Sequence, residues 1–338
     1  MTTHDWFEEL TGFREHDYAQ TQSWLRVEGD ELVSTVNGAR YGIGSLSVPT
    51  LAELRSRIAI PMRGRSTVRC VTGDARAMHA EPELAGALFQ VASQFNLLEM
   101  VQPNVTPEEG VTRYAGDPTQ GPACAMAAGA ATIYRNYFAP VDGESGQTRE
   151  RQIDALRPLG EALASKLSRP VSDLWTMSNG YALCTASGLD AIAGLLAGCS
   201  DDERDELRSR LAIGVHRDVD VTDVHEDARR LVSQAFCSAL PVAYGGGERS
   251  SWEAFARLVL EASYEATLLS AVEQSVEGSN VVLLTRVGGG VFGNADAWID
   301  DAIVRALRIV EHAGLDVRLV SFGSVHPSFR AIAERFGG

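Results

Sequence analysis

Four acidic residues of the chain have the type and spacing that acid–base chemistry requires: Glu99, Asp117, Asp218 and Asp220. Carboxylates placed near a reacting carbon can activate a water molecule and stabilise developing positive charge. Carboxylates can also bind a guanidinium group in a bidentate way. Glu99 could equally be a solvated loop carboxylate.

Asp218 and Asp220 stand in a segment with strand character, where alternate side chains face the same way. If that segment runs antiparallel to the strands that carry the site, its beginning lies at their carboxyl ends. Asp218 and Asp220 would then lie beside the site, with Asp223 farther away. The alternative is an exposed edge strand whose charges prevent aggregation. We name Asp220, Asp218 and Glu99 as the catalytic candidates.

A glycine-rich segment supplies a different kind of chemistry. Residues Gly288-Gly289-Gly290-Val291-Phe292-Gly293-Asn294 follow the apolar run 281–284 and precede a segment with helical spacing that ends near Gly314. The apolar run predicts a buried strand. A strand, a glycine turn and a helix N-terminus together favour a bound anion, because backbone amides and the helix dipole face it. The alternative is a simple tight turn.

A second junction of this kind begins in the long polar loop 102–119, a length that is usually functional. The loop ends at Asp117-Pro118-Thr119-Gln120-Gly121-Pro122, and an alanine-rich helix is expected over 123–137. Two anion-binding junctions in one chain suit a diphosphate better than either junction alone. Tyr244 and Phe292 are placed to stack on a ribose or a base, with core packing as the alternative for Phe292.

Strand and helix patterns along the chain predict an α/β protein. Residues 31–41 read as a hairpin turning at Asn37-Gly38. Further strands are expected at 68–71, 89–95, 212–215, 219–222, 231–244 and 317–322. Helices are expected at 51–58, 82–88, 153–167 (kinked by Pro158), 189–196, 201–210, 250–272 and after Pro327.

Composition excludes several classes of function. The chain has 338 residues and a net charge of −15, which argues against a nucleic-acid binder, since phosphates would be repelled. No apolar run reaches membrane-spanning length, and the first ten residues do not resemble a signal peptide. The five cysteines form no CxxC pair and the histidines no HExxH motif, so a cytoplasmic protein without a metal or other cofactor is expected.

With these segments placed, the sequence resembles the macrodomain family, whose α/β/α fold binds ADP-ribose. Thr72-Gly73-Asp74-Ala75 resembles the family's Gly-Asp-Ile/Val, in which the Asp accepts from the adenine amino group. Ala92-Ser93-Gln94-Phe95-Asn96 stands where the family has Asn-Ala-Ala-Asn, whose last Asn meets the distal ribose. Gln120-Gly121-Pro122 replaces the first phosphate loop, and the segment from Gly289 to Gly293 closely resembles the second.

The resemblance is to a divergent branch near the poly(ADP-ribose) glycohydrolases and the bacterial effectors that release ADP-ribose from arginine on ubiquitin. It implies a three-layer α/β/α fold with a mixed sheet over residues 66–338, an N-terminal elaboration over 1–65 and an insertion at about 143–210. It implies an ADP-ribosyl hydrolase acting on a modified protein side chain, arginine being favoured, with ubiquitin as one such protein. The alternatives are a module that binds ADP-ribose without turnover and a protein for another nucleotide diphosphate. The expected ligand contacts are Asp74, Ala75, Asn96, Asp117, Gln120, Gly121, Tyr244, Gly288, Gly289, Gly290, Val291, Phe292, Gly293 and Asn294.

Overall fold

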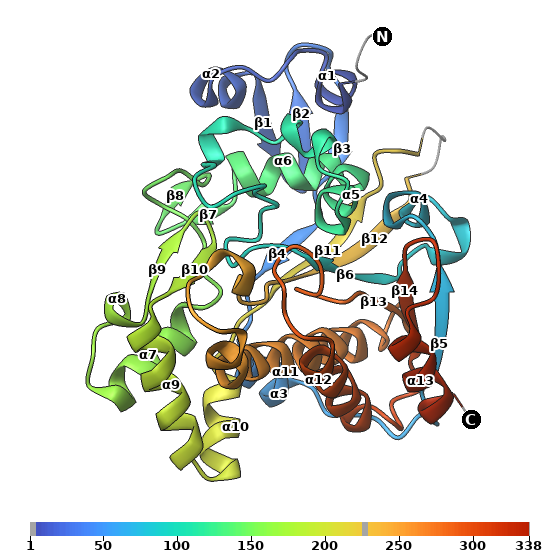
Figure 1. The fold of residues 1–338 in the computed structure, drawn as a ribbon. Helices are drawn as coiled ribbons and strands as arrows, with labels where there is room; N and C mark the ends of the chain where they lie inside the picture. The colour runs from blue at the N-terminus through green and yellow to red at the C-terminus, as the bar shows by residue number, and fades with distance from the viewer. Residues whose placement is uncertain (1–4, 225–228, 338) are drawn as a thin grey trace.

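The computed structural model describes residues 5–224 and 229–337. Its centre is a seven-stranded mixed sheet (Figure 1). In spatial order the strands are β4 (Ser45–Ser47), β11 (Gly214–Asp220), β12 (Leu231–Cys237), β6 (Leu88–Ala92), β13 (Val281–Leu284), β14 (Asp316–Ser321) and β5 (Thr67–Thr72). The five strands from β12 to β5 run parallel to their neighbours, whereas β11 runs antiparallel to both β12 and β4.

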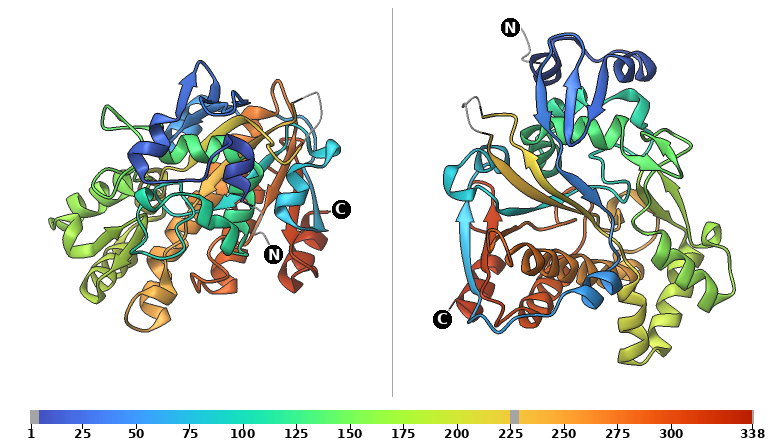
Figure 2. Two further views of the ribbon diagram at one scale, coloured as in Figure 1. Left: turned by 90° about the horizontal axis from the view of Figure 1, so that it is seen from above. Right: turned by 180° about the vertical axis from the view of Figure 1, so that it is seen from behind.

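Helices cover both faces of the sheet, which confirms the predicted α/β/α fold class (Figures 1 and 2). One face carries α5 (Gln120–Ala127) and α6 (Gly129–Tyr137), with α4 (Ala75–His79) beside α5. The other face carries α11 (Arg249–Gln274), α12 (Asp296–Ile309), α3 (Leu51–Arg57) and α13 (Pro327–Phe336). Central strands β6 and β13 are almost entirely buried, as expected for strands covered on both faces.

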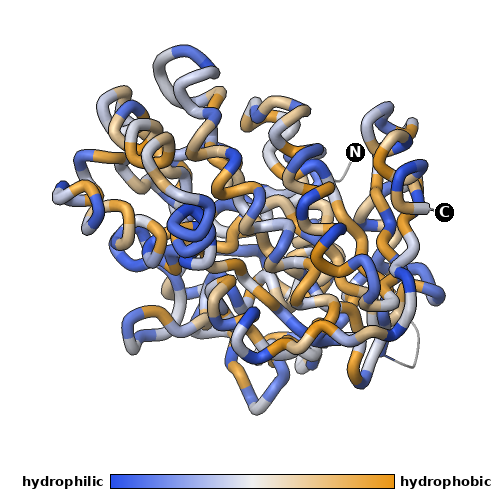
Figure 3. The backbone as a smooth tube through the Cα atoms, turned by 90° about the horizontal axis from the view of Figure 1, so that it is seen from below, coloured by the Kyte–Doolittle hydropathy of each residue, from blue (hydrophilic) through white to orange (hydrophobic). Residues whose placement is uncertain are grey.

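The hydropathy pattern explains how the outer helices attach. In α12 the residues Trp298, Ile299, Ala302, Ile303 and Ala306 are buried and recur at helical spacing. Figure 3 shows the resulting mixture of hydrophobic and hydrophilic residues along the helices. Among the described residues, no helix is both long and apolar enough to span a membrane.

The N-terminal region has two parts. Helices α1 (Trp6–Thr11) and α2 (Tyr18–Ser23) and the meander β1 (Leu25–Glu28), β2 (Glu31–Ser34) and β3 (Arg40–Gly42) pack against α6, and the pairing of β2 with β3 confirms the expected hairpin. Strand β4 and helix α3, by contrast, join the main sheet and its α11 layer. The segment 45–57 is therefore continuous with the main domain.

The insertion lies at one side of the sheet and is mostly helical (Figure 1). It contains β7 (Pro140–Val141), β8 (Glu144–Ser145), α7 (Arg157–Leu167), α8 (Val171–Leu174), β9 (Trp175–Ser178), β10 (Tyr181–Cys184), α9 (Ala186–Gly198) and α10 (Asp201–Ser209). Pro158 does not kink α7; it stands in the first turn, where a missing amide hydrogen costs nothing. The antiparallel pair β9–β10 points toward the carboxyl ends of the parallel strands.

Several predicted elements were wrong in extent. Residues 82–88 form only the short 3₁₀ turn η1 (Pro82–Leu84), because Leu88 already belongs to β6. The expected helix 123–137 is two helices separated at Ala128, whose φ of −114° and ψ of 58° are not helical. The loop 102–119 holds two further 3₁₀ turns, η2 (Pro107–Glu109) and η3 (Thr112–Gly116), and the run 231–244 ends its strand at Cys237 before the turn η4 (Val242–Tyr244).

Candidate functional site

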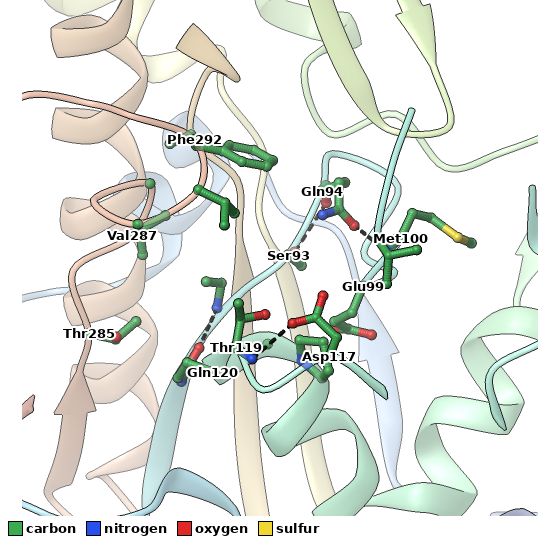
Figure 4. Close-up of a pocket in the computed structure, with 18 of the residues that line it drawn as sticks. Ser93, Gln94, Glu99, Met100, Asp117, Thr119, Gln120, Thr285, Val287 and Phe292 are labelled. Atoms are coloured by element: carbon green, nitrogen blue, oxygen red, sulfur yellow. Dashed lines mark hydrogen bonds between the residues drawn. The ribbon is translucent and has the colours of Figure 1, made fainter. Parts of the chain in front are cut away.

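A cavity of about 510 Å³ opens at the carboxyl ends of β6, β12 and β13 (Figure 4). Its walls come from four parts of the chain: residues 92–94 and 99–101 after β6, residues 116–122 at the start of α5, residues 239 and 244 after β12, and residues 285–288 and 290–292 after β13. The insertion adds one side chain, Tyr181. Ligands bind at this edge in open α/β sheets, because the loops after the strands converge there.

The glycine loop after β13 has a shape that one glycine dictates. Gly288 has a φ of 75°, and a Cβ atom there would lie 2.4 Å from the Cβ of Ala239 and 2.7 Å from Nδ2 of Asn294. Asn294 is buried, and its Nδ2 donates to the carbonyl oxygens of Leu240 (2.9 Å) and Gly288 (3.3 Å). The close packing around Gly288 and the hydrogen bonds of Asn294 therefore fix the backbone conformation of the loop.

This loop presents free backbone amides. The amides of Gly289 and Gly293 close two turns by donating to Arg286 O and Gly290 O, each at 3.0 Å. The amides of Gly290, Val291 and Phe292 have no hydrogen-bond partner within residues 5–224 and 229–337. Successive unpaired amides at one turn form an anion-binding concavity.

Arg286 brings a guanidinium to the cavity beside this loop, but acidic side chains already balance its charge. Arg286 pairs with Asp296 (2.8 Å) and Asp300 (2.5 Å), and its side chain is 13% exposed. Any anion held here would depend on backbone amides rather than on a side-chain cation.

The start of α5 forms the facing wall. Gln120 bridges α5 to β6, since its Oε1 accepts from Ala92 N and its Nε2 donates to Gln90 O, each at 2.9 Å. A Cβ on Gly121 would lie 2.0 Å from Ala92 O and 3.2 Å from Cγ of Glu99, so only glycine allows this approach. Asp117 lines the same wall, and its Oδ1 accepts from Thr119 N at 2.9 Å.

Glu99 is the most unusual side chain in the cavity wall. It is 2% exposed, and neither of its carboxylate oxygens has a hydrogen-bond partner among the described residues. The closest cationic contact is Arg135, whose Nη2 lies 3.6 Å from Glu99 Oε2. Burial raises the pKa of Glu99 to about 7, and the attraction of Arg135 only partly opposes this rise. Such a carboxyl group can exchange a proton near neutral pH.

Three aromatic rings form another wall. The ring centroid of Tyr181 lies 5.3 Å from those of both Tyr244 and Phe292, which are 5.8 Å from each other. The Tyr181 hydroxyl donates to Met100 O at 2.5 Å and accepts from Nε2 of Gln94 at 3.4 Å. Tyr181 was missed from the sequence because it lies in the insertion; the turn Ser178-Asn179-Gly180 before it marks a hairpin but not its direction.

The structure brings nine of the expected contacts to one cavity: Glu99, Asp117, Gln120, Gly121, Tyr244, Gly288, Gly290, Val291 and Phe292. Figure 4 shows Glu99 and Asp117 on neighbouring segments of its wall. Gly289, Gly293 and Asn294 shape the loop without lining the cavity. Ser93, Gln94, Thr119 and Thr285 also line it and had not been foreseen.

Asp218 and Asp220 lie elsewhere, and their expected position has to be corrected. Strand β11 does run antiparallel to β12, which was the condition for placing the pair beside the site, but Asp220 pairs with Leu231, at the beginning of β12 and away from the cavity. A bulge between His216 and Val219 breaks the alternation of side chains, leaving Asp218 exposed at a φ of 54°. Asp220 is buried instead, accepting from Gly42 N at 3.3 Å with Arg229 at 3.5 Å.

Asn96 also lies outside the cavity wall. It is fully buried, its Nδ2 donates to Gln152 Oε1 at 2.8 Å, and its Oδ1 accepts from Leu98 N at 3.1 Å. Its visible role is to fix the loop that delivers Glu99. That loop begins with Leu97 at a φ of 63°.

Asp74 and Ala75 lie at the end of β5, beyond the main cavity. Asp74 Oδ1 accepts from Ala77 N at 2.9 Å and caps α4, whereas Ala75 lines a narrow slot together with Gln120 and Thr285, two residues of the main cavity. Phe322 follows the neighbouring strand β14 and is 84% exposed. An exposed phenylalanine at this edge is a candidate for stacking that the sequence pattern did not reveal.

Within the described part of the chain, no three His, Cys, Asp or Glu side chains are grouped so that they could hold a metal ion. The five cysteines are free thiols, of which Cys124 and Cys237 are buried.

No protein-family model matches the chain, and no curated protein matches it. Among solved structures it is similar to poly(ADP-ribose) glycohydrolase from Thermomonospora curvata, with a TM-score of 0.45 and 11% identity over 93% of this chain and 94% of that chain. The same glycohydrolase bound to the inhibitor ADP-HPD gives 0.43 and 12% over 93% and 94%. The glycohydrolase from Deinococcus radiodurans in complex with ADP-ribose gives 0.43 and 13% over 87% and 96%.

The TM-scores of these glycohydrolases lie below 0.5. The functional conclusion therefore rests on the cavity and its residues.

Proposed function

We propose that this chain is an ADP-ribosyl hydrolase, which binds ADP-ribose attached to a protein side chain and cleaves the glycosidic bond. One observation carries the proposal: among the described residues, the two oxygens of the buried Glu99 have no hydrogen-bond partner, and the same cavity is lined by a loop whose amides at 290–292 are also unpaired. The first feature suits proton transfer, and the second suits a phosphate group.

The diphosphate is assigned to the space between the two glycine-containing junctions. The amides of Gly290, Val291 and Phe292 would bind one phosphate, and the start of α5 at Gly121 would face the other. The adenine would lie near the slot beside Ala75, with the preceding residue Asp74 and the exposed Phe322 after β14 as its partners. The distal ribose is left at the Glu99 end, beside the aromatic wall of Tyr181, Tyr244 and Phe292.

In the proposed reaction the ionised Glu99 accepts a proton from a water molecule that attacks the anomeric carbon of the distal ribose. The bond from that carbon to the side-chain nitrogen breaks, the nitrogen leaves with the bonding electron pair, and it takes up the proton that Glu99 received from water, so Glu99 is ionised again. Asp117, on the adjacent wall, stabilises positive charge on the ribose or on the departing group. Asp218 and Asp220 take no part in this scheme, because they do not line the cavity.

For the linkage we favour arginine, with ubiquitin as a modified protein to test. A departing guanidinium is a cation that Asp117 can pair with. The net charge of −15 would also attract a basic protein segment.

The alternative function is a module that binds ADP-ribose without turnover. Such a module gains nothing from a buried carboxyl group whose oxygens have no hydrogen-bond partner among the described residues, because burying that group costs stability. Glu99 therefore favours the hydrolase.

The proposal is tested by incubating the protein with arginine-, glutamate- and serine-linked ADP-ribosyl proteins, including arginine-modified ubiquitin, and measuring released ADP-ribose. Glu99→Gln should lower release by about 10²–10⁴-fold, while calorimetry shows unchanged affinity for ADP-ribose. Glu253→Gln, at an exposed residue of α11, is the control and should change neither quantity. Binding of ADP-ribose without release from any substrate would favour the module that binds without turnover. No binding at millimolar ADP-ribose would exclude both functions.

A further inference from the structure

Arg135 is a charged residue that lies entirely inside the protein. It stands on α6 with no exposed surface, and the face of its guanidinium lies 3.9 Å from the ring centroid of Phe236 on β12. A buried guanidinium is costly unless its donors are satisfied and its charge is balanced. Its contacts should therefore reveal what the charge is used for.

Most donors of Arg135 are used to hold the guanidinium in place. Nε donates to Leu97 O at 3.0 Å, and Nη2 donates to Thr132 Oγ1 at 3.0 Å. Nη1 lies 3.5 Å from Nδ1 of His216. Because Leu97 belongs to the loop that carries Glu99, the guanidinium is tied to the backbone just before that carboxylate.

The contact between Arg135 and Glu99 has an unusual form. The nearest nitrogen–oxygen distance is 3.6 Å, slightly longer than a hydrogen bond, and both Glu99 oxygens remain without a hydrogen-bond partner among the described residues. A bidentate arginine–carboxylate pair would occupy those oxygens. Here the positive charge acts on Glu99, a residue of the cavity wall, while both of its buried oxygens stay free of hydrogen bonds from the described residues.

The other groups that face Glu99 are neutral or lie across the cavity. Tyr114 of η3 accepts the Glu99 amide hydrogen at 3.1 Å, and burial raises its pKa well above the usual value. Burial likewise raises the pKa of Cys124 on α5. Burial and the charge of Arg135 lower the pKa of His216 on β11 well below its usual value, so that ring is neutral behind the guanidinium. Asp117 lines the cavity from the loop before α5.

We infer that Arg135 is a positioning residue for Glu99: its fixed guanidinium beneath the cavity orients the carboxylate and favours the charged form, without occupying its oxygens. Arg135 does not touch the cavity. The expected effect of Arg135 on catalysis rests on the proposed function. The energetic coupling between the buried charges of Arg135 and Glu99 does not, because it can be measured without any enzymatic turnover.

The first experiment is a double-mutant cycle with Arg135→Met, Glu99→Gln and the double variant, followed by urea unfolding at pH 5.5 and pH 8.5. Arg135→Met should lower the unfolding midpoint more at pH 8.5, where Glu99 is charged. The coupling between the two substitutions should correspond to at least a tenfold change in the unfolding constant at pH 8.5 and should vanish at pH 5.5. A coupling that is equal at both pH values, or absent at both, overturns the inference.

Arg208→Met is the matched control, because Arg208 is also largely buried and paired with carboxylates, but on α10 and away from the cavity. It should show no coupling to Glu99→Gln at either pH. If Arg135→Met does not fold, Arg135→Lys replaces it in the same cycle. Lysine keeps the charge but cannot hold the same contacts, so a coupling reduced from that of arginine supports the inference and an absent pH dependence overturns it.

The second readout is the pH profile of ADP-ribose release. In the wild type the acidic limb should report Glu99; in Arg135→Met that limb should move up by at least one pH unit, while calorimetric affinity for ADP-ribose stays within threefold. Arg135→Lys should restore part of the shift. An unmoved limb overturns the catalytic consequence. A protein that shows the pH-dependent coupling but releases ADP-ribose from no substrate would contradict the proposed function and leave the charge coupling established.

Discussion

The ring of Tyr181 lies 5.3 Å from the ring of Phe292, although the two residues come from different parts of the fold. Tyr181 belongs to β10 of the insertion, and Phe292 belongs to the glycine loop after β13. The insertion is thus joined to the cavity through an aromatic contact. It completes a wall that the main sheet and its loops leave open.

Tyr181→Ala should weaken ADP-ribose binding by roughly tenfold, which corresponds to about 1.4 kcal/mol, the order of an aromatic contact. Tyr181→Phe keeps the ring and loses the hydroxyl's hydrogen bonds to Met100 O and from Gln94 Nε2, so it should bind nearly as well as the wild type. Calorimetry with ADP-ribose compares the three proteins. Equal affinities for all three would show that the insertion contributes nothing to this ligand.

Gly288→Ala should abolish binding, since a Cβ atom would lie 2.4 Å from Ala239 and the left-handed backbone would be strained. Gly194→Ala is the matched control: this exposed glycine of α9 has no atom within 4 Å of a Cβ position, and alanine should stabilise the helix by up to about 1 kcal/mol. Binding and thermal unfolding are measured for both. If Gly288→Ala binds normally, the glycine loop is not the anion site.

Glu99 should impose a pH dependence on stability. Its pKa in the folded protein, about 7, lies above the ordinary value of 4.5, so the folded chain keeps a proton that the unfolded chain releases. The stability contribution is complete below pH 4.5 and is lost as the pH rises to 7. Glu99→Gln should remove this loss, which is on the order of 3 kcal/mol. Urea unfolding between pH 4 and pH 8 gives the two curves; parallel curves would show that Glu99 has an ordinary pKa.

Asp220→Ala should change the rate of ADP-ribose release by no more than about twofold. Asp220 pairs with the first residue of β12, whereas the cavity lies at the carboxyl ends of the parallel strands. The substitution should instead lower the free energy of unfolding by about 1 kcal/mol through loss of the hydrogen bond from Gly42. Release assays and urea unfolding separate the two effects. A large loss of release with intact stability would return Asp220 to the catalytic candidates.

Glu265→Gln should destabilise the layer of helices under the sheet. Glu265 has a side chain that is 3% exposed, and it pairs with Arg55 of α3 at 2.6 Å and with Arg305 of α12. Removing the charge leaves both guanidinium groups short of a partner, at a cost of roughly 3 kcal/mol. Glu253→Gln, on the same helix but at an exposed pair with Arg257, should cost about 0.5 kcal/mol or less. Similar losses for the two variants would contradict this account.

The sequence predicted the parts of the fold that depend on local pattern. Strand β13, helix α12 and the β2–β3 hairpin each combine strong periodicity or turn chemistry with clear boundaries, and the structure contains all three. The helix over 123–137 was predicted as one element because alanine tolerates helix everywhere. Only tertiary contacts show why the helix is interrupted: Gly129 N donates to Thr222 Oγ1, a residue 93 positions away in the sequence.

Two kinds of expected site residue, several loop glycines and the carboxylates Glu99 and Asp117, line the cavity, whereas Asp218 and Asp220 do not. Gly288 and Gly121 have sequence signals because no other residue fits. Asp218 and Asp220 alternate as strand residues should, but the bulge that separates their faces has no local signature. The role of Arg135 was invisible for the same reason. An arginine near the end of a helix is usually solvated, and its burial depends on residues 38 and 81 positions away.

Strand β5 has a consequence for how the chain must assemble. Within the described residues it pairs with only one other strand, β14. Residues 67–72 can therefore join the sheet only after residues 316–321 are present and folded. Closing so long a loop is slow, because chain entropy is lost before the contact forms. During synthesis on the ribosome, strand β5 would stay unpaired until residues 316–321 had also been made. We therefore expect late, all-or-none closure of this edge, with Asp74 reaching its final position only after β14 docks.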